Sequence, residues 1–170
     1  SHIGGNIATN AGGIKVIRYG MTRDQVLGLK VVDGRGEVLD LNRGLVKNNT
    51  GPDLRHLFVG SEGILGIITE ATLALRNVPG PQDVMLLAVR DFVSIMDVLR
   101  VFTRGLTLGA FEFFGHNGLE RVLGRLQRKA PLAVAAPFYV LLEFEHEGAD
   151  ATDQAMRLFE QCVEAGWVTE

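Results

Sequence analysis

Glycine recurs at every third position in GSEGILGIIT, residues 60–69 of this chain. Because glycine has no Cβ, this spacing lets the backbone turn sharply and lie against a flat or charged ligand. From Ile67 to Leu75 the side chains alternate between two faces, which predicts a β-strand. Ile67 and Leu73 are expected on one face and Ile68 on the other. A glycine-rich loop attached to a stiff strand is suited to holding a cofactor.

The glycine spacing matches neither common nucleotide fingerprint. It is neither the G-x-G-x-x-G of a Rossmann turn nor the G-x-x-x-x-G-K-[ST] of a P-loop. Taken alone, the segment is also typical of a plain turn between a short helix and a strand. A ligand site therefore needs support from the rest of the chain.

Composition limits the classes of protein to consider. The chain has 170 residues, 46% of them apolar, enough to build the core of one domain or of two small ones. No apolar run approaches the roughly 18 residues of a membrane span, and a net charge of −3 gives no basic surface for nucleic acid. The single cysteine, Cys162, excludes an internal disulfide and indicates a reducing compartment. We expect a soluble cytoplasmic protein, or a mitochondrial matrix protein in a eukaryote.

The opening segment, Ser1–Ile14, consists almost entirely of small and amide residues. We expect its backbone N–H groups to be exposed in a turn or nest conformation, which can bind an anion such as a diphosphate. Asn6, Thr9 and Asn10 add polar side chains. Such a segment is atypical of a chain terminus, which is usually disordered. We therefore expect the chain to be part of a longer protein.

The rest of the first half predicts a hairpin and a helix. Val26–Val32 and Glu37–Leu41 are expected strands, and Asp33-Gly34 between them is typical of a type I′ turn. Asp53–Val59 is an expected short helix that ends at Gly60, where glycine suits the left-handed position of a C-cap.

Asn77–Asp83, with two prolines and a glycine, marks a boundary between two parts of the chain. Beyond it, strands and helices alternate in the order β-α-β-α-β-α, which predicts an α/β or α+β layer domain. The expected strands are Val84–Arg90, Ala110–Phe114 and Pro137–Glu145, and the expected helices start at Asp91 or Ser94, at Leu119 and at Thr152. The expected aromatic core consists of Phe92, Phe102, Phe111, Phe113, Phe138, Tyr139 and Phe144.

Three segments together resemble the FAD-linked oxidases of the vanillyl-alcohol-oxidase type, or FAD-binding oxidase/transferase type 4. They are Ile3–Gly13 with Arg18–Gly20, then Asn49–Leu54, then Gly60–Thr69, in the family's order and at its approximate separations. The resemblance is greatest to the branch of D-lactate dehydrogenase, the glycolate oxidase flavin subunit and D-2-hydroxyglutarate dehydrogenase. Ala110–Phe113 favours the hydroxyglutarate type.

The resemblance implies an α+β fold and a cofactor site. Residues 1–78 would be the second part of a two-subdomain FAD-binding domain, and residues 79–170 the first part of an α+β substrate or cap domain. Glu62 either contacts the cofactor or caps its own turn. The implied FAD-binding residues are Gly4, Gly5, Asn6, Asn10, Gly12, Gly13, Glu62, Gly63, Gly66, Ile67 and Ile68.

The implied reaction is oxidation of a D-2-hydroxy acid, such as D-lactate, glycolate or D-2-hydroxyglutarate, to the 2-oxo acid. Hydride would pass to the flavin, and the electron acceptor would be other than NAD. The family's first diphosphate loop, its substrate-binding arginine and its histidine and acidic metal ligands have no counterpart here. The catalytic residues are therefore unknown, a divalent metal would be held by residues outside this chain, and we expect this piece alone to be inactive.

Two other functions remain open at this point. One is another oxidase or transferase of the superfamily, of the alkylglycerone-phosphate synthase type. The other is a non-catalytic binding or structural domain whose glycines only form turns. The expected partners are a small-molecule hydroxy acid and an electron acceptor, with neither nucleic acid nor a transmembrane segment, and a homo-oligomer stays open.

Other reactive residues are interpreted as structural. The four histidines, at positions 2, 56, 116 and 146, show no metal-binding spacing, and His146-Glu147 is expected to be a solvated strand end. Cys162 lies on the apolar stripe of the last helix and is expected to be a core thiol. A basic group is expected to form a solvated helix face, with anion binding as the alternative. It consists of Arg121, Arg125, Arg128 and Lys129.

Overall fold

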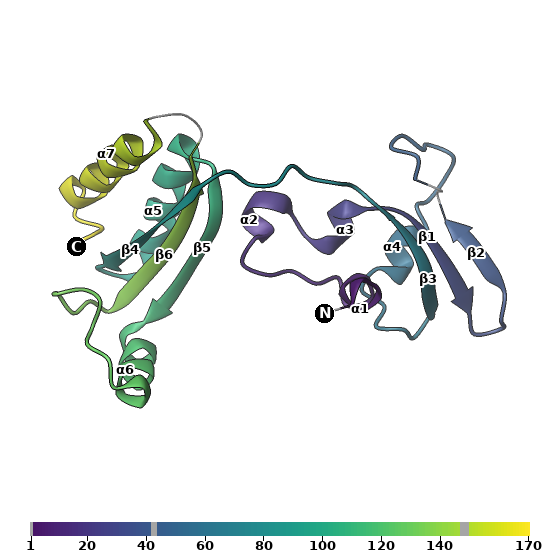
Figure 1. The fold of residues 1–170 in the computed structure, drawn as a ribbon, viewed down its shortest axis with the longest axis horizontal. Coiled ribbons are helices and arrows are strands. Elements are labelled where there is room, and N and C mark those ends of the chain that lie inside the picture. Colours follow the sequence, from purple (N-terminus) through teal and green to yellow (C-terminus); the bar gives the residue numbers. More distant parts are fainter. Residues whose placement is uncertain (1, 42–43, 147–149) are drawn as a thin grey trace. The chain divides into compact units, whose positions relative to one another are not determined.

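The computed structural model describes residues 2–41, 44–146 and 150–170. The chain divides into two compact units, Ser1–Asn77 and Val78–Glu170 (Figure 1). Each unit has its own antiparallel sheet and its own helices, so the predicted α+β class is confirmed. In the described parts of the chain, no helix is both long and apolar enough to cross a membrane.

The first unit is built on a three-stranded sheet of order β2-β1-β3, with β1 antiparallel to both neighbours. The strands are β1 (Val26–Asp33), β2 (Val38–Leu41) and β3 (Gly66–Leu73). Val26, Leu29 and Val31 of β1 are buried and supply most of the sheet's share of the core. The central strand is therefore the most buried of the three, as expected for a strand with neighbours on both edges.

The predicted hairpin between β1 and β2 is present, but its turn is not type I′. The left-handed residue is Gly36, with φ of 84°, rather than Gly34. The N–H of Gly36 bonds the carbonyl of Asp33 at 3.0 Å, and the Asp33 carboxylate accepts from the N–H groups of Arg35 and Glu37. This is a type I turn closed by a left-handed glycine. The hydrogen bonds to the Asp33 carboxylate stabilise it relative to a type I′ turn.

The predicted strict alternation along β3 is wrong, because the β1–β3 pair contains bulges. Lys30 pairs with Glu70, whereas the next residue, Val31, pairs with Ile68, which leaves Thr69 as an extra residue. Thr69 Oγ1 donates to the Lys30 carbonyl at 3.1 Å. The bulge switches the inward face, so that Ile68 and Leu73 both pack on the core.

Four short helices accompany this sheet: α1 (Ile3–Ala8), α2 (Val16–Tyr19), α3 (Thr22–Gln25) and α4 (Arg55–Phe58). The predicted nest in the opening segment is wrong there, because residues 3–8 are helical and the N–H of Asn6 bonds the His2 carbonyl. Ile7 explains this, since its fully buried side chain packs with Phe58 and Val59. Tertiary packing overrides the weak helix propensity of two glycines and an asparagine.

The second unit is a sheet of order β4-β6-β5, also fully antiparallel, with helices on it. Helices α5 and α7 share the main apolar core with one face of the sheet, and α6 packs with a smaller cluster around Tyr139 (Figure 1). The elements are β4 (Gln82–Val89), α5 (Phe92–Gly105), β5 (Leu108–Gly115), α6 (His116–Leu126), β6 (Phe138–Glu145) and α7 (Ala151–Glu164).

Asp91, one of the two expected caps, is the N-cap of α5. Its carboxylate accepts from the N–H of Ser94 at 2.8 Å and from the Ser94 hydroxyl at 2.9 Å. These hydrogen bonds, together with one from Arg90, lower the pKa of Asp91 to about 2. The helix therefore starts one residue after the aspartate, as a side-chain cap requires.

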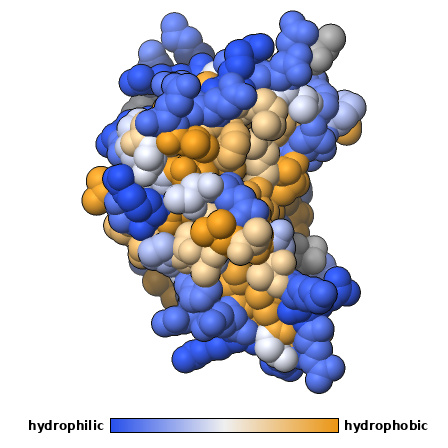
Figure 2. All heavy atoms as spheres, turned by 90° about the vertical axis from the view of Figure 1, so that its left-hand side faces the viewer, coloured by the Kyte–Doolittle hydropathy of each residue, from blue (hydrophilic) through white to orange (hydrophobic). Residues whose placement is uncertain are grey.

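The predicted aromatic core is partly wrong. Phe102, Tyr139 and Phe144 are buried, but Phe92 and Phe113 are 57% and 49% exposed. Phe92 packs edge-on against Phe113, with ring centroids 5.7 Å apart. Both belong to the apolar side chains that this unit leaves exposed, and Figure 2 shows a band of apolar side chains crossing one face of the molecule. The alternation of apolar and polar residues along a strand does not show which part of the strand other elements cover.

Two phenylalanines of α5 provide a matched test of this core. Phe102→Ala should lower the free energy of unfolding by about 3–5 kcal/mol, because it empties a fully buried site. Phe92→Ala, on the same helix, should cost about 1 kcal/mol or less. Urea denaturation of both variants measures the difference, and equal losses would contradict the assignment of Phe102 to the core.

Candidate cofactor-binding site

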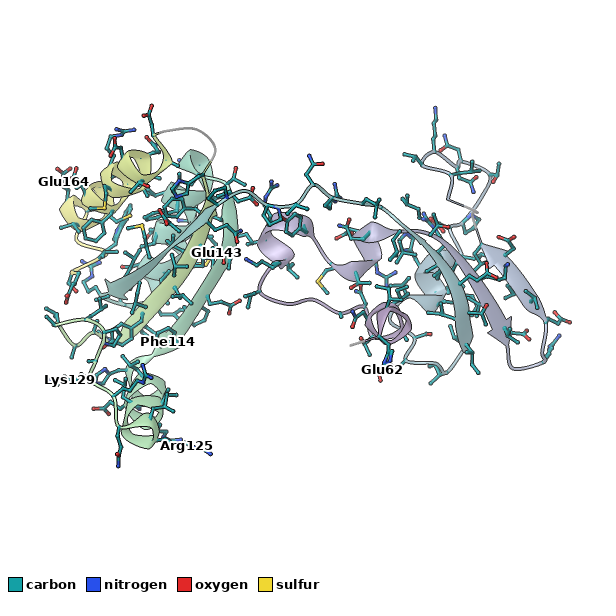
Figure 3. All side chains as sticks on the ribbon, viewed as in Figure 1. Glu62, Phe114, Arg125, Lys129, Glu143 and Glu164 are labelled. Atoms are coloured by element: carbon teal, nitrogen blue, oxygen red, sulfur yellow. The ribbon has the colours of Figure 1, made fainter. Side chains whose placement is uncertain are left out.

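The two glycine-rich segments of the sequence meet in the first unit. The N–H of Gly60 bonds the carbonyl of Ile7 at 3.1 Å, and the N–H of Glu62 bonds the carbonyl of Ala8 at 2.8 Å. Glu62 accordingly lies beside α1 (Figure 3). Of the predicted site residues, Gly4, Gly5 and Asn6 lie in α1, Asn10, Gly12 and Gly13 in the segment after it, Glu62 and Gly63 in the turn, and Gly66, Ile67 and Ile68 at the start of β3.

The turn between α4 and β3 has an unusual backbone. Gly60, Glu62 and Gly63 all have positive φ, of 84°, 51° and 83°. A glutamate rarely adopts this conformation, which costs roughly 1–2 kcal/mol for a residue with a Cβ. The hydrogen bond from Glu62 N to Ala8 holds it there. This bond shows why the turn persists, and it does not exclude a contact between the Glu62 side chain and a ligand.

Four of the predicted glycines leave open space. A Cβ built on Gly4, Gly5, Gly13 or Gly63 would meet no protein atom within 4 Å. At Gly66, by contrast, a Cβ would lie 2.6 Å from the Val32 carbonyl oxygen, so the sheet itself requires glycine there. At Gly12 it would lie 2.6 Å from the Met21 sulfur. The fold therefore requires glycine at Gly66, whereas at Gly12 the flexible Met21 side chain could move aside. Positive φ favours glycine at Gly63, and a ligand that approaches the backbone closely would explain Gly4, Gly5 and Gly13.

Asn6 and Asn10 are used at least in part by the protein itself. The main-chain carbonyl of Asn6 accepts from the N–H of Ala11 at 2.8 Å. Asn10 has a positive φ of 48°, and its Oδ1 accepts from the N–H of Arg23 at 2.9 Å. Arg23 was not singled out from the sequence. A lone arginine carries no sequence pattern that indicates a contact with Asn10, thirteen positions away.

Exposed apolar side chains neighbour the open glycines in sequence. Ile67 is 71% exposed and Ile64, in the preceding turn, is also exposed, whereas Ile68 packs on the core. Ile3 and Ile14, which flank the first glycine-rich segment, are exposed as well. Exposed apolar groups next to open backbone suit the flat, largely apolar ring system of a flavin.

The remaining reactive side chains lie apart from these segments or are exposed on the surface of the described residues. Within residues 2–41, 44–146 and 150–170, no three His, Cys, Asp or Glu side chains lie close enough together to hold a metal ion. His146 Nε2 lies 2.7 Å from Asp83 Oδ2, while Glu147, its expected neighbour at a strand end, lies outside the described residues. The four residues of the basic group are exposed, as predicted, and Arg125 and Lys129 are labelled in Figure 3. The predicted single helix face is wrong, because α6 ends at Leu126 with a left-handed Gln127, which leaves Arg128 and Lys129 beyond the helix.

Two family profiles match the chain. The one described as "FAD linked oxidases, C-terminal domain" matches residues 78–170, more than half of the chain, and the one described as "FAD binding domain" matches residues 1–42. This chain belongs to the FAD-linked oxidases. The resemblance found from the three sequence segments is therefore confirmed, and FAD is the cofactor for which the family is named.

Within the FAD-linked oxidases, the chain is 54% identical over 170 residues to D-2-hydroxyglutarate dehydrogenase of Stutzerimonas stutzeri, covering 100% of this chain and 37% of that protein. It is 41% identical over 160 residues to the mitochondrial D-2-hydroxyglutarate dehydrogenase of Arabidopsis thaliana, covering 92% and 28%. The chain thus spans about a third of the length of these relatives.

A solved structure of alkyldihydroxyacetonephosphate synthase superposes with a TM-score of 0.68 at 18% identity, covering 98% of this chain and 32% of that one. This likeness confirms the fold of an FAD-linked oxidase. At this identity it says nothing about the synthase reaction.

The glycines predict opposite effects of two alanine substitutions. Gly5→Ala should raise the stability of the protein by about 0.5–1 kcal/mol in the absence of flavin, because alanine favours the helix and meets no neighbour. Gly66→Ala should lower it by about 1–3 kcal/mol, because its Cβ collides with backbone. Thermal unfolding measures both. A loss of stability in Gly5→Ala would mean that the space at Gly5 is not open.

Cys162 should be unreactive in the folded protein. It lies on α7 with its side chain fully buried in the main apolar core, and burial raises the pKa of the thiol to about 11. At about pH 8 a disulfide reagent should therefore label less than a tenth of the thiol in native protein and one equivalent in urea. Rapid native labelling would contradict the buried position.

Proposed function

We propose that this chain is part of an FAD-dependent dehydrogenase that oxidises D-2-hydroxyglutarate to the corresponding 2-oxo acid. The observation that carries the proposal is the 54% identity, over every residue of the chain, to a D-2-hydroxyglutarate dehydrogenase. Relatives from plant and animal mitochondria with the same name extend the similarity to both units. D-Lactate and glycolate are the alternative substrates within the same class of D-2-hydroxy acids.

The two units would have different roles in the longer protein. Residues 1–78 would form the C-terminal part of the FAD-binding domain, and residues 79–170 the N-terminal part of the substrate domain. The boundary between the compact units after Asn77 and the start of the second family match at Val78 support this division. The remaining parts of both domains would come from the rest of the protein.

The open glycines of the first unit fit an FAD. The main chain at Gly4, Gly5 and Gly13 would contact the FAD directly, because a Cβ there would fill space that no protein atom occupies. Gly63 would approach it from the turn, where positive φ also requires glycine. Asn6, Asn10, Glu62 and Ile67 would lie along the same site. When bound, FAD accepts the hydride from the α-carbon of the hydroxy acid.

The described residues supply positioning and shape rather than acid–base chemistry. We assign no catalytic acid or base among them. The groups that bind the substrate carboxylates would lie in the rest of the protein. Electrons would then leave to an acceptor other than NAD.

The test uses the purified protein that contains this chain. It should show flavin absorption near ~450 nm, and D-2-hydroxyglutarate should bleach this absorption under anaerobic conditions. L-2-Hydroxyglutarate is the control for stereochemistry, and D-lactate and glycolate are the controls for side-chain length.

The outcomes separate cofactor from substrate. Bleaching by D-lactate or glycolate but not by D-2-hydroxyglutarate would refute the hydroxyglutarate assignment and would support the assignment of a flavin cofactor. A protein without flavin, even after incubation with FAD, would refute the whole proposal.

A further inference from the structure

Arg23 of α3 contacts both segments that form the candidate flavin site. Its backbone N–H donates to Asn10 Oδ1 at 2.9 Å, which fixes the end of the first glycine-rich segment. Its guanidinium donates to the carbonyl oxygens of Val59, at 2.6 Å, and His56, at 2.9 Å. One residue therefore joins three stretches of the chain that are far apart in sequence.

The guanidinium occupies the C-terminal end of α4. The last carbonyl groups of a helix have no partner within the helix and carry partial negative charge. Arg23 satisfies two of them, and its Nη1 also lies 3.0 Å from Nδ1 of His56. Among the described residues its guanidinium is bonded to carbonyl and imidazole groups, and no carboxylate competes for it.

The contacts of Arg23 lie directly before the left-handed turn. Val59, whose carbonyl it binds, is buried, and the next residue, Gly60, begins the turn with a φ of 84°. A Cβ on Gly60 would lie 3.5 Å from Arg23 Nη2 and 3.3 Å from Asn10 Cβ. Arg23 and Asn10 thus pack on the face of Gly60 from which a side chain is missing.

We propose that Arg23 is a positioning residue for the flavin site: it holds the Gly60–Gly63 turn against the Ile3–Gly13 segment. The backbone hydrogen bonds from Gly60 to Ile7 and from Glu62 to Ala8 are the contacts that it keeps in register. The open glycines of both segments keep a fixed spacing only while these bonds persist. The flavin part of this inference rests on the proposed function.

Arginine suits this position better than lysine. The two carbonyl oxygens are bound by different nitrogens of one planar group, Nη1 and Nη2. A lysine ammonium is a compact point charge and cannot present two fixed N–H groups in this fork geometry. Arg23→Lys should therefore retain part of the function of Arg23, whereas Arg23→Met keeps only the aliphatic stem.

The first test follows amide hydrogen exchange in the FAD-free protein that contains this chain. In Arg23→Met the N–H groups of Gly60 and Glu62 should exchange about tenfold faster or more than in the wild type. Arg23→Lys should give an intermediate rate. Arg35→Met, in the exposed hairpin turn of the same unit, is the matched control and should leave these rates unchanged.

The second test measures the dissociation constant of FAD by flavin fluorescence and the visible circular dichroism of the bound flavin. Arg23→Met should weaken FAD binding about tenfold to a hundredfold and change the dichroism, with Arg23→Lys in between and Arg35→Met like the wild type. A merely structural arginine would lower the unfolding temperature and leave both flavin readouts of the folded protein unchanged.

The outcomes are distinguishable. Wild-type exchange at Gly60 and Glu62 in Arg23→Met would overturn the positioning role. Faster exchange with unchanged flavin affinity would overturn its link to the cofactor. If Arg23→Met fails to fold, Arg23→Lys decides both points. A wild-type protein that binds no FAD would refute the proposed function, and the exchange rates would still decide whether Arg23 holds the turn.

Discussion

The first unit depends on a pair of backbone hydrogen bonds between segments more than fifty residues apart, from Gly60 to Ile7 and from Glu62 to Ala8. They form only because Ile7 is buried against Phe58 and Val59, which brings α1 onto the end of α4. The left-handed turn that follows is strained at Glu62, and the same bonds hold it in place. Packing of apolar side chains thus sets the spacing of two polar, glycine-rich segments that have almost no core of their own.

The sequence predicts the strands and the longer helices well, because their signals are local. The apolar run of β1, the apolar stripe of α5 and the Asp91 cap are each visible within a short stretch of sequence. The bulge at Thr69 and the turn at Gly36 were missed because each depends on a partner strand or on a side-chain bond. Helix α1 was missed because a single buried isoleucine outweighs the poor helix propensity around it.

The candidate site likewise has features that the sequence predicts and features that only the structure shows. The glycine positions were visible in the sequence, but their roles were not, since glycine looks the same whether a ligand, a neighbouring strand or a positive φ requires it. Only the surroundings distinguish Gly66, which lies against the Val32 carbonyl, from Gly5, which faces open space. Arg23 gave no sequence signal, because its partners are backbone carbonyls that any residue could supply.

The contrast between Gly5 and Gly66 also bears on evolution. On the proposed role of Gly4, Gly5 and Gly13 in binding FAD, a descendant that lost the cofactor would no longer be under selection for glycine there, and alanine at Gly4 or Gly5 would favour helix α1. Gly66 would persist, because the sheet still needs it. Substitutions at Gly4, Gly5 and Gly13 together with a retained Gly66 would therefore identify pseudoenzymes of this family from sequence alone.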